Sequence, residues 1–283
     1  MARTYIERLL GQKTIFTRAA GFVLAVYSLI ALYLIPITML SAFKTKDDLI
    51  HNTMGLPRSF TLANFRAVLV DDGFFGFFLN SVALTSLSLV SLLFVASMTA
   101  YGLSRYDFKG KQFMQSYFLV GMMFPIQLGI LPIFIIIRTL GLSNNFLGMA
   151  LLYTANLSLP VFIFSRFFRL LPKSLHESAV IDGANEFTIY ARVMMPISKP
   201  VFATVGILNF VLVWNDFYLP LVFLTKKGVR TLTLAIYRYM SNFLANWHLV
   251  FAAVTIALIP VLLAFFIFSE QLVAGLTAGS VKE

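Results

Sequence analysis

The chain has 283 residues and a formal net charge of +10, and 59% of its residues are hydrophobic while only 12% are charged. An ordinary soluble domain carries roughly 25% charged residues, so this composition excludes a soluble globular domain. The absence of cysteine excludes disulfides, thiol chemistry and cysteine-ligated metals, and the scattered positive charge does not form the basic patch expected of a nucleic-acid-binding protein.

Long stretches without Asp, Glu, Lys or Arg predict membrane spans, because each exceeds the roughly 20 residues that cross a bilayer core. Five such stretches are uninterrupted, and a sixth is broken only by Asp216. We therefore predict an all-α integral membrane protein, with residues 1–283 forming a single transmembrane domain of six helices. The predicted spans cover residues 19–43, 74–100, 112–138, 146–168, 200–224 and 248–270.

The first span follows four basic residues, which is also typical of a secretory signal. A cleavable signal has an apolar core of only about 7–15 residues, so we expect this longer stretch to be retained. With the N-terminus inside, the inner segments hold 13 Lys and Arg residues and the outer segments hold nine. This bias predicts cytoplasmic N- and C-termini and outward-facing loops at 44–72 and 226–248.

A polar segment, "LPKSLHESAVIDGANEFTIYARVMMP", separates the fourth and fifth predicted spans. Ser174 followed by Glu177 is the capping-box pattern, which predicts a helix from Ser174 to about Asp182. Gly183 can take the left-handed backbone conformation that ends helices.

A second helix is predicted after this turn. Asn185 is expected to cap it, and it should stop before Pro196, because the residue before a proline is disfavoured in the helical region.

Small side chains are spaced four apart on the first of these helices, as in Ser178 and Asp182 or Leu175 and Ala179. Such a face lets another protein approach closely, and a plain connector would be shorter, since most run about 2–8 residues. Two interpretations stay open on these grounds: a docking element for a cytoplasmic partner, or an amphipathic helix lying at the lipid head groups.

The spacing in this segment resembles the EAA loop of permease subunits in binding-protein-dependent ABC importers. That loop reads E-A-A, three residues, G, nine residues, then I-x-L-P. The chain keeps the spacing at Glu177, Gly183 and Pro196 and departs in side chain at Ser178, Val193 and Met195.

Four further segments are similar to the carbohydrate-uptake branch of this family, and most similar to the second permease subunit of maltose-type importers. They read "YGLSRYDFKGKQ", "GLSNNFLGMALLY", "VWNDFYLPLVFL" and "QLVAGLTAGSVKE". The resemblance implies a type I ABC importer permease fold and uptake of a sugar or oligosaccharide delivered by an extracytoplasmic binding protein.

The resemblance also implies how energy reaches the chain. A cytoplasmic coupling loop at 171–199 would dock on an ATP-binding subunit through Glu177, Ser178, Ala179, Ile181, Asp182 and Gly183. The implied partners are two ATP-binding subunits that hold ATP and Mg, a second and different permease, and the binding protein at loop 226–248. The tail Gly275–Glu283 would approach the ATPase pair, in a prokaryotic cytoplasmic (inner) membrane.

Polar groups within the spans are candidates for the translocation path or its gate: Gln127, Asn156, Asn209, Trp214, Asn215 and Asp216. The amides either bond neighbouring helices or line a path, with Gln127 and Asn209 nearest the midplane. Asp216 is either an interfacial carboxylate between aromatic residues or part of a gate at the outer end. Pro125, Pro132 and Pro160 are expected to bend their helices.

Other functions fit the sequence less well. A G-x-x-x-x-G-K-[ST] phosphate loop is absent, so we expect no ATPase activity and no bound cofactor in this chain. A self-sufficient secondary transporter would favour midplane carboxylates and internal symmetry. An intramembrane enzyme would need Ser and His or paired Asp at one depth, and the three histidines are not spaced as a metal set. Import of a non-sugar solute such as a glycerol phosphate is the remaining alternative.

Overall fold

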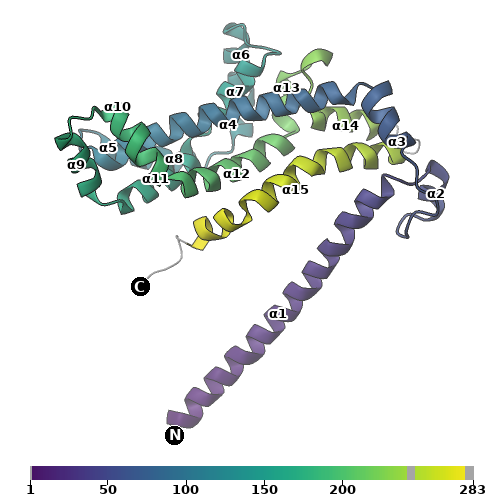
Figure 1. Cartoon of the computed structure of the whole chain (residues 1–283), viewed down its shortest axis with the longest axis horizontal. Coiled ribbons are helices and arrows are strands. Elements are labelled where there is room, and N and C mark those ends of the chain that lie inside the picture. Colours follow the sequence, from purple (N-terminus) through teal and green to yellow (C-terminus); the bar gives the residue numbers. More distant parts are fainter. Residues whose placement is uncertain (1, 241–245, 278–283) are drawn as a thin grey trace. The chain divides into compact units, whose positions relative to one another are not determined.

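The structure is a computed structural model that describes residues 2–240 and 246–277, and its regular secondary structure in that part is entirely helical (Figure 1). In chain order the elements are α1 (Ala2–Ser41), α2 (Lys46–His51), α3 (Ala63–Arg66), the π-helical η1 (Ala67–Asp71), α4 (Phe74–Arg105), α5 (Lys111–Gly121), the 3₁₀ turn η2 (Ile126–Gly129), α6 (Ile130–Thr139), α7 (Phe146–Ala155), α8 (Ser158–Leu170), α9 (Lys173–Ile181), α10 (Glu186–Thr188), the π-helical η3 (Ile189–Met194), α11 (Met195–Ile197), α12 (Lys199–Asn215), α13 (Tyr218–Phe223), the 3₁₀ turn η4 (Lys227–Val229), α14 (Leu232–Met240) and α15 (Trp247–Thr277).

Three helical segments are long and apolar enough to cross a membrane without a break: Thr17–Ser41, Phe74–Arg105 and Trp247–Ser269. Three further pairs of helices reach that length only together. They are bent by 95° (Lys111–Gly121 with Ile126–Thr139), 54° (Phe146–Ala155 with Ser158–Leu170) and 79° (Glu186–Ile197 with Lys199–Asn215). The described residues therefore hold up to six spans, three of which are broken.

The spans predicted at 112–138, 146–168 and 200–224 are each interrupted, the last of them after Asn215, where α12 ends. The bends expected at prolines in the first two are present as breaks beside Pro125 and Pro160. Prolines mark where the helices restart: Pro160 and Pro220 each lie in the first turn of the helix that follows an interruption, and Pro125 is the N-cap residue of η2. The missing N–H of proline costs least there, since first-turn N–H groups have no partner within the helix. These prolines therefore start new helices rather than kink continuous ones.

The chain divides into two compact units. The larger comprises residues 73–238 and 257–277 of the described chain, and in it α4 packs along α7, α8 and α12, while α5 packs on α8. The smaller comprises residues 2–72, 239–240 and 246–256 of the described chain. The boundaries of the predicted single membrane domain stay a prediction.

In the smaller unit, the loop after α1 is built around a buried lysine. Lys44 is fully buried, and its ammonium donates to the carbonyl oxygens of Asn52 (2.7 Å) and Thr53 (3.1 Å). The side chain of Asn64 donates to the carbonyl oxygens of Ala42 and Lys44, both at 2.8 Å. These bonds satisfy the buried charge and hold the loop in one conformation.

Asp48 completes this loop, and we expect it to make the order of the loop depend on pH. The backbone N–H of Arg58 donates to its carboxylate at 2.9 Å and lowers the pKa of Asp48 below its ordinary value. Because the pKa is lower in the folded loop, this stabilisation is present above the unfolded pKa of about 3.9 and is lost as the pH falls through the folded pKa.

Hydrogen-exchange protection of peptides from residues 44–66, corrected for intrinsic rates, should therefore fall when the pH is lowered from 7 toward 3. Asp48→Asn should remove most of this pH dependence. Asp47→Asn, at the exposed neighbouring position, is the matched control and should leave it unchanged. Equal behaviour of the two variants would contradict the assignment.

Candidate functional site

The segment between α8 and α12 begins with α9, which starts one residue earlier than predicted. Pro172 occupies the N-cap position, and no side chain among the described residues caps this helix. The capping-box prediction for Ser174 and Glu177 is therefore wrong. Proline has no N–H and a preset φ, so Pro172 leads directly into a helix that begins at Lys173. Among the described residues, no hydrogen bond or salt bridge involves the Glu177 side chain, which is exposed.

The turn that ends α9 is a Schellman motif, as the glycine predicts. Gly183 has a φ of +77°, and its N–H donates to the carbonyl of Val180 at 3.0 Å. The N–H of Ala184 donates to the carbonyl of Ala179, also at 3.0 Å. These two bonds satisfy carbonyls that a helix end otherwise leaves without a partner, and the left-handed φ favours glycine at this position.

The predicted cap of the second helix is confirmed, but its predicted end is wrong. Asn185 accepts a hydrogen bond from the backbone N–H of Thr188 at 2.8 Å. The helix then continues through the π-helical η3 and passes Pro196, which lies in the first turn of α11. The wider π-helical turn shifts the hydrogen-bond register before the proline. Ser198 donates from its hydroxyl to the carbonyl of Met194 at 2.7 Å.

One side of this segment is part of the main hydrophobic core of the larger unit. Ala179, Ile189, Tyr190 and Met194 are buried in it. The core also contains residues from α4, α8 and α12: Ala96, Ala100, Tyr101, Leu103, Val161, Phe164, Phe168, Val201 and Val205. The segment is therefore packed onto three long helices and is not a loose connector.

Hydrogen bonds reinforce this packing. The hydroxyl of Tyr101 on α4 donates to Glu186 Oε2 at 3.0 Å, and His176 Nε2 lies 3.3 Å from the same carboxylate. The hydroxyls of Ser97 and Tyr190 are 2.7 Å apart. The pKa of Tyr106 is raised to about 12, mainly by partial burial and secondly by a hydrogen bond to Glu186. Its hydroxyl therefore stays protonated and can donate. Glu186 therefore connects α9, α10 and the end of α4.

The other side of the segment is open. Ile181 is 85% exposed and Phe187 is 61% exposed, although both are apolar. Glu177, Ser178 and Asp182 are also exposed, so two carboxylates border the apolar groups. The six residues predicted to dock on a partner therefore do not share one face, because Ala179 points into the core while the other five are exposed. Such an apolar surface with a charged edge is typical of a protein-docking site.

A scan of protein families matches residues 92–277 to the binding-protein-dependent transport system inner membrane component. The matched region includes the whole segment described above. The chain belongs to this family.

Relatives of known name agree over most of the chain. It is 32% identical over 265 residues to the probable ABC transporter permease protein YurM of Bacillus subtilis, covering 91% of this chain and 88% of the relative. It is 32% identical to AmyC of Thermoanaerobacterium thermosulfurigenes, named as a probable permease protein for starch degradation products, with 93% and 95% covered. It is 34% identical to MsmG of Streptococcus mutans, a multiple sugar-binding transport system permease protein, with 89% and 92% covered.

A solved structure shows the same fold. A chain of a bacterial ABC transporter that imports the acidic polysaccharide alginate superposes with a TM-score of 0.78 at 24% identity, covering 90% of this chain and 96% of that one. The protein is thus an inner-membrane, multi-pass permease subunit of an ABC importer with the type I permease fold, and its family is a transport component without ATPase motifs.

The candidate path residues of the permease lie mostly at the helix breaks. Gln127 is exposed in η2, between α5 and α6, and Asn156 is exposed at the end of α7. Asn215 ends α12, where its amide donates to the carbonyl of Val211 at 3.0 Å. Asp216 lies in the gap before α13. The polar positions thus mark where the helices are interrupted, which the sequence pattern did not reveal.

The two remaining candidates are buried on α12, Asn209 in its interior and Trp214 one residue before its end. The side chain of Asn209 donates to the carbonyl of Val205, one turn earlier in its own helix, at 2.8 Å. The indole N–H of Trp214 donates to the carbonyl of Ala257 in α15 at 3.1 Å. Their predicted role in a path or gate stays a prediction.

Sequence reasoning missed Glu186, Tyr101 and His176 as partners. Tyr101 and Glu186 are 85 residues apart in the chain, so no local spacing could pair them. The signal that was available is the family-like segment "YGLSRYDFKGKQ", which begins with Tyr101 itself.

Proposed function

We propose that the permease carries a sugar or oligosaccharide that an extracytoplasmic binding protein delivers. The support is the printed function of its relatives, among them transport proteins for starch degradation products and for multiple sugars. Uptake of radiolabelled oligosaccharides by the reconstituted importer tests this proposal. Uptake of a glycerol phosphate but of no sugar would overturn it.

Energy for this transport is proposed to enter through the segment 171–199, the coupling loop. The observation that carries this proposal is that the loop has one exposed apolar face and one face buried against α4, α8 and α12. A protein core is close-packed, so a push on one element displaces the elements packed against it. Movement of a docked partner would then reach three long helices directly.

The proposed partners are two ATP-binding subunits, which would hold ATP and Mg, a second and different permease, and the sugar-binding protein. The coupling loop and both termini would face the cytoplasm, with loops 44–72 and 226–248 outside. Part of the second loop, residues 241–245, lies outside the described residues, as do residues 278–283 of the tail that would approach the ATPase pair.

Single cysteines test both the sidedness and the docking, because the chain has no cysteine of its own to give background. Ile181→Cys and Leu56→Cys are matched, since both side chains are highly exposed, at 85% and 71%. In the assembled importer, we expect Ile181→Cys to cross-link to an ATP-binding subunit and to resist a membrane-impermeant thiol reagent in whole cells. Leu56→Cys should react with that reagent and give no such cross-link.

The reverse labelling pattern would place the loop on the outer face. The same variant should also be tested in inside-out membrane vesicles, where the reagent reaches the cytoplasmic face of the assembled importer. Free reaction of Ile181→Cys there, without a cross-link to an ATP-binding subunit, would contradict docking at this face.

A further inference from the structure

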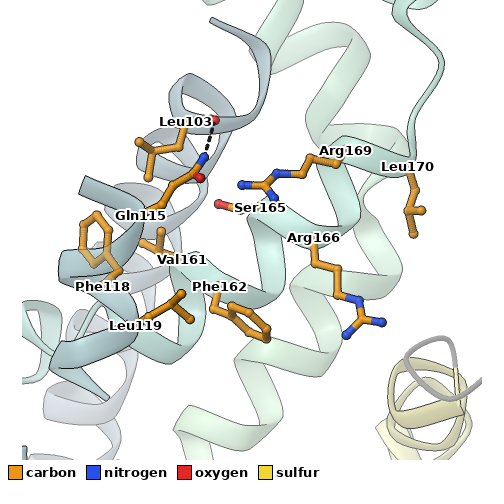
Figure 2. A pocket seen from close by; sticks show the side chains of 10 residues that line it. All are labelled: Leu103, Gln115, Phe118, Leu119, Val161, Phe162, Ser165, Arg166, Arg169 and Leu170. Carbon is orange, nitrogen blue, oxygen red and sulfur yellow. Dashed lines mark hydrogen bonds between the residues drawn. The ribbon is translucent and has the colours of Figure 1, made fainter. Parts of the chain in front are cut away.

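A pocket of about 450 Å³ lies between α5 and α8 in the larger unit, at the end of α4 that leads toward the coupling loop (Figure 2). Its lining comes from three elements: Leu103 of α4, Gln115, Phe118 and Leu119 of α5, and Val161, Phe162, Ser165, Arg166, Arg169 and Leu170 of α8.

The polar floor of the pocket contains a hydroxyl without a partner. Ser165 is only 8% exposed, and its Oγ has no hydrogen-bond partner among the described residues. Several other helical hydroxyls donate to the carbonyl four residues earlier, as Ser104 does to Ala100 at 2.8 Å. In Figure 2 the Ser165 oxygen faces the space between Gln115 and the Arg169 guanidinium. A buried hydroxyl left unpaired is costly, which indicates a ligand atom at this point.

Two further donors converge on the same space. The guanidinium of Arg169 points toward Ser165, and none of the salt bridges among the described residues includes Arg169 (Figure 2). Gln115 donates one amide hydrogen to the carbonyl of Leu103 at 3.4 Å, which leaves its second hydrogen available. A guanidinium, an amide and a hydroxyl together match the oxygen atoms of a phosphate, which guanidinium groups bind in a bidentate manner.

Apart from Arg166, the rest of the lining is apolar, and part of it is exposed. Leu119, Phe162 and Leu170 are 49%, 40% and 72% exposed. A free phosphate ion gains nothing from such walls, whereas a phospholipid has a phosphate and acyl chains in one molecule. Basic pockets between transmembrane helices are known to bind acidic lipid head groups.

We propose that this pocket binds an anionic phospholipid of the phosphatidylglycerol type, with its phosphodiester at Arg169, Ser165 and Gln115 and an acyl chain along Leu119 and Phe162. The proposal goes beyond the transport function and does not depend on the transported solute. A bound lipid contacts α5 and α8 at once, so it holds these two helices together beside the coupling loop.

The test uses the whole importer in nanodiscs of phosphatidylcholine and phosphatidylglycerol, with retained lipid measured by native mass spectrometry after transfer to detergent. We expect Arg169→Gln to weaken retention of phosphatidylglycerol about tenfold, because one charge-assisted bidentate pair is lost. Arg138→Gln is the matched control, since Arg138 is an exposed arginine in the last turn of α6 and does not line the pocket. Equal retention by the two variants would overturn the proposal.

Two further results separate a lipid from other ligands and from misfolding. Added inorganic phosphate should not displace the lipid, and displacement at millimolar phosphate would assign the pocket to the free ion instead. In the unmodified protein, phosphatidylglycerol with a photoreactive acyl chain should label peptides from residues 111–121 and 158–170. Labelling confined to other helices would overturn the lipid assignment without any variant.

Discussion

Gly183→Pro should reduce uptake by the assembled importer at least tenfold while the permease remains inserted in the membrane. Proline is fixed at a φ of about −65°, whereas Gly183 has a φ of +77°. The substitution also removes the N–H that donates to Val180. The end of α9 must then unwind, and the exposed Glu177, Ile181 and Asp182 lose their fixed positions. The apolar stretches that enter the membrane are unchanged by this substitution, so insertion should be retained.

The chain contains a matched control for backbone strain. Gly141 has a φ of +70° and closes an equivalent turn between α6 and α7, where its N–H donates to the carbonyl of Arg138 at 3.0 Å. Gly141→Pro should lower stability without changing the uptake obtained per ATP hydrolysed by the folded fraction. In contrast, Gly183→Pro should leave hydrolysis and uptake uncoupled, as should Glu177→Ala to a smaller extent. Full uptake by Gly183→Pro with assembly intact would count against the coupling role.

Asp216→Ala should destabilise the permease by about 2–4 kcal/mol, the sum of one lost helix cap and one buried hydroxyl left unpaired. Its Oδ1 accepts hydrogen bonds from the backbone N–H groups of Tyr218 (2.9 Å) and Leu219 (3.4 Å) at the start of α13. Its Oδ2 accepts from the hydroxyl of Tyr153 on α7 at 2.8 Å. Asp216 therefore joins the break after α12 to a second span.

Asn215→Ala is the control for this prediction, because Asn215 is exposed and its amide donates to the carbonyl of Val211 in its own helix. Its cost should stay within about 0.5 kcal/mol, as for most surface changes. Thermal unfolding of both variants, and of Tyr153→Phe alone and combined with Asp216→Ala, measures the coupling. Additive effects of the Tyr153 and Asp216 changes would show that their hydrogen bond carries no stability.

Local features of the site were predictable because the backbone rules behind them involve only a few neighbouring residues. A glycine after a helical stretch predicts a left-handed turn, and Gly183 forms one. An asparagine before a helical stretch predicts an N-cap, and Asn185 is one. The capping-box prediction was wrong because Pro172, two residues before Ser174, is the N-cap residue, so the helix begins at Lys173. Competition between two adjacent signals is decided by geometry that spacing alone does not contain.

Composition by itself determined that this protein belongs in a membrane, because apolar stretches of this length are long enough to cross a bilayer and too many to be buried in a soluble core. The spacing around Gly183 and four further segments resemble one permease family, and the family comparison shows that the chain belongs to it. Only the tertiary structure decided that Ala179 faces inward, that Glu186 bonds to Tyr101, and that Gln115 and Arg169 line the same pocket. These facts depend on how helices distant in sequence pack together, and helical periodicity says which residues share a face but not which helix that face will meet.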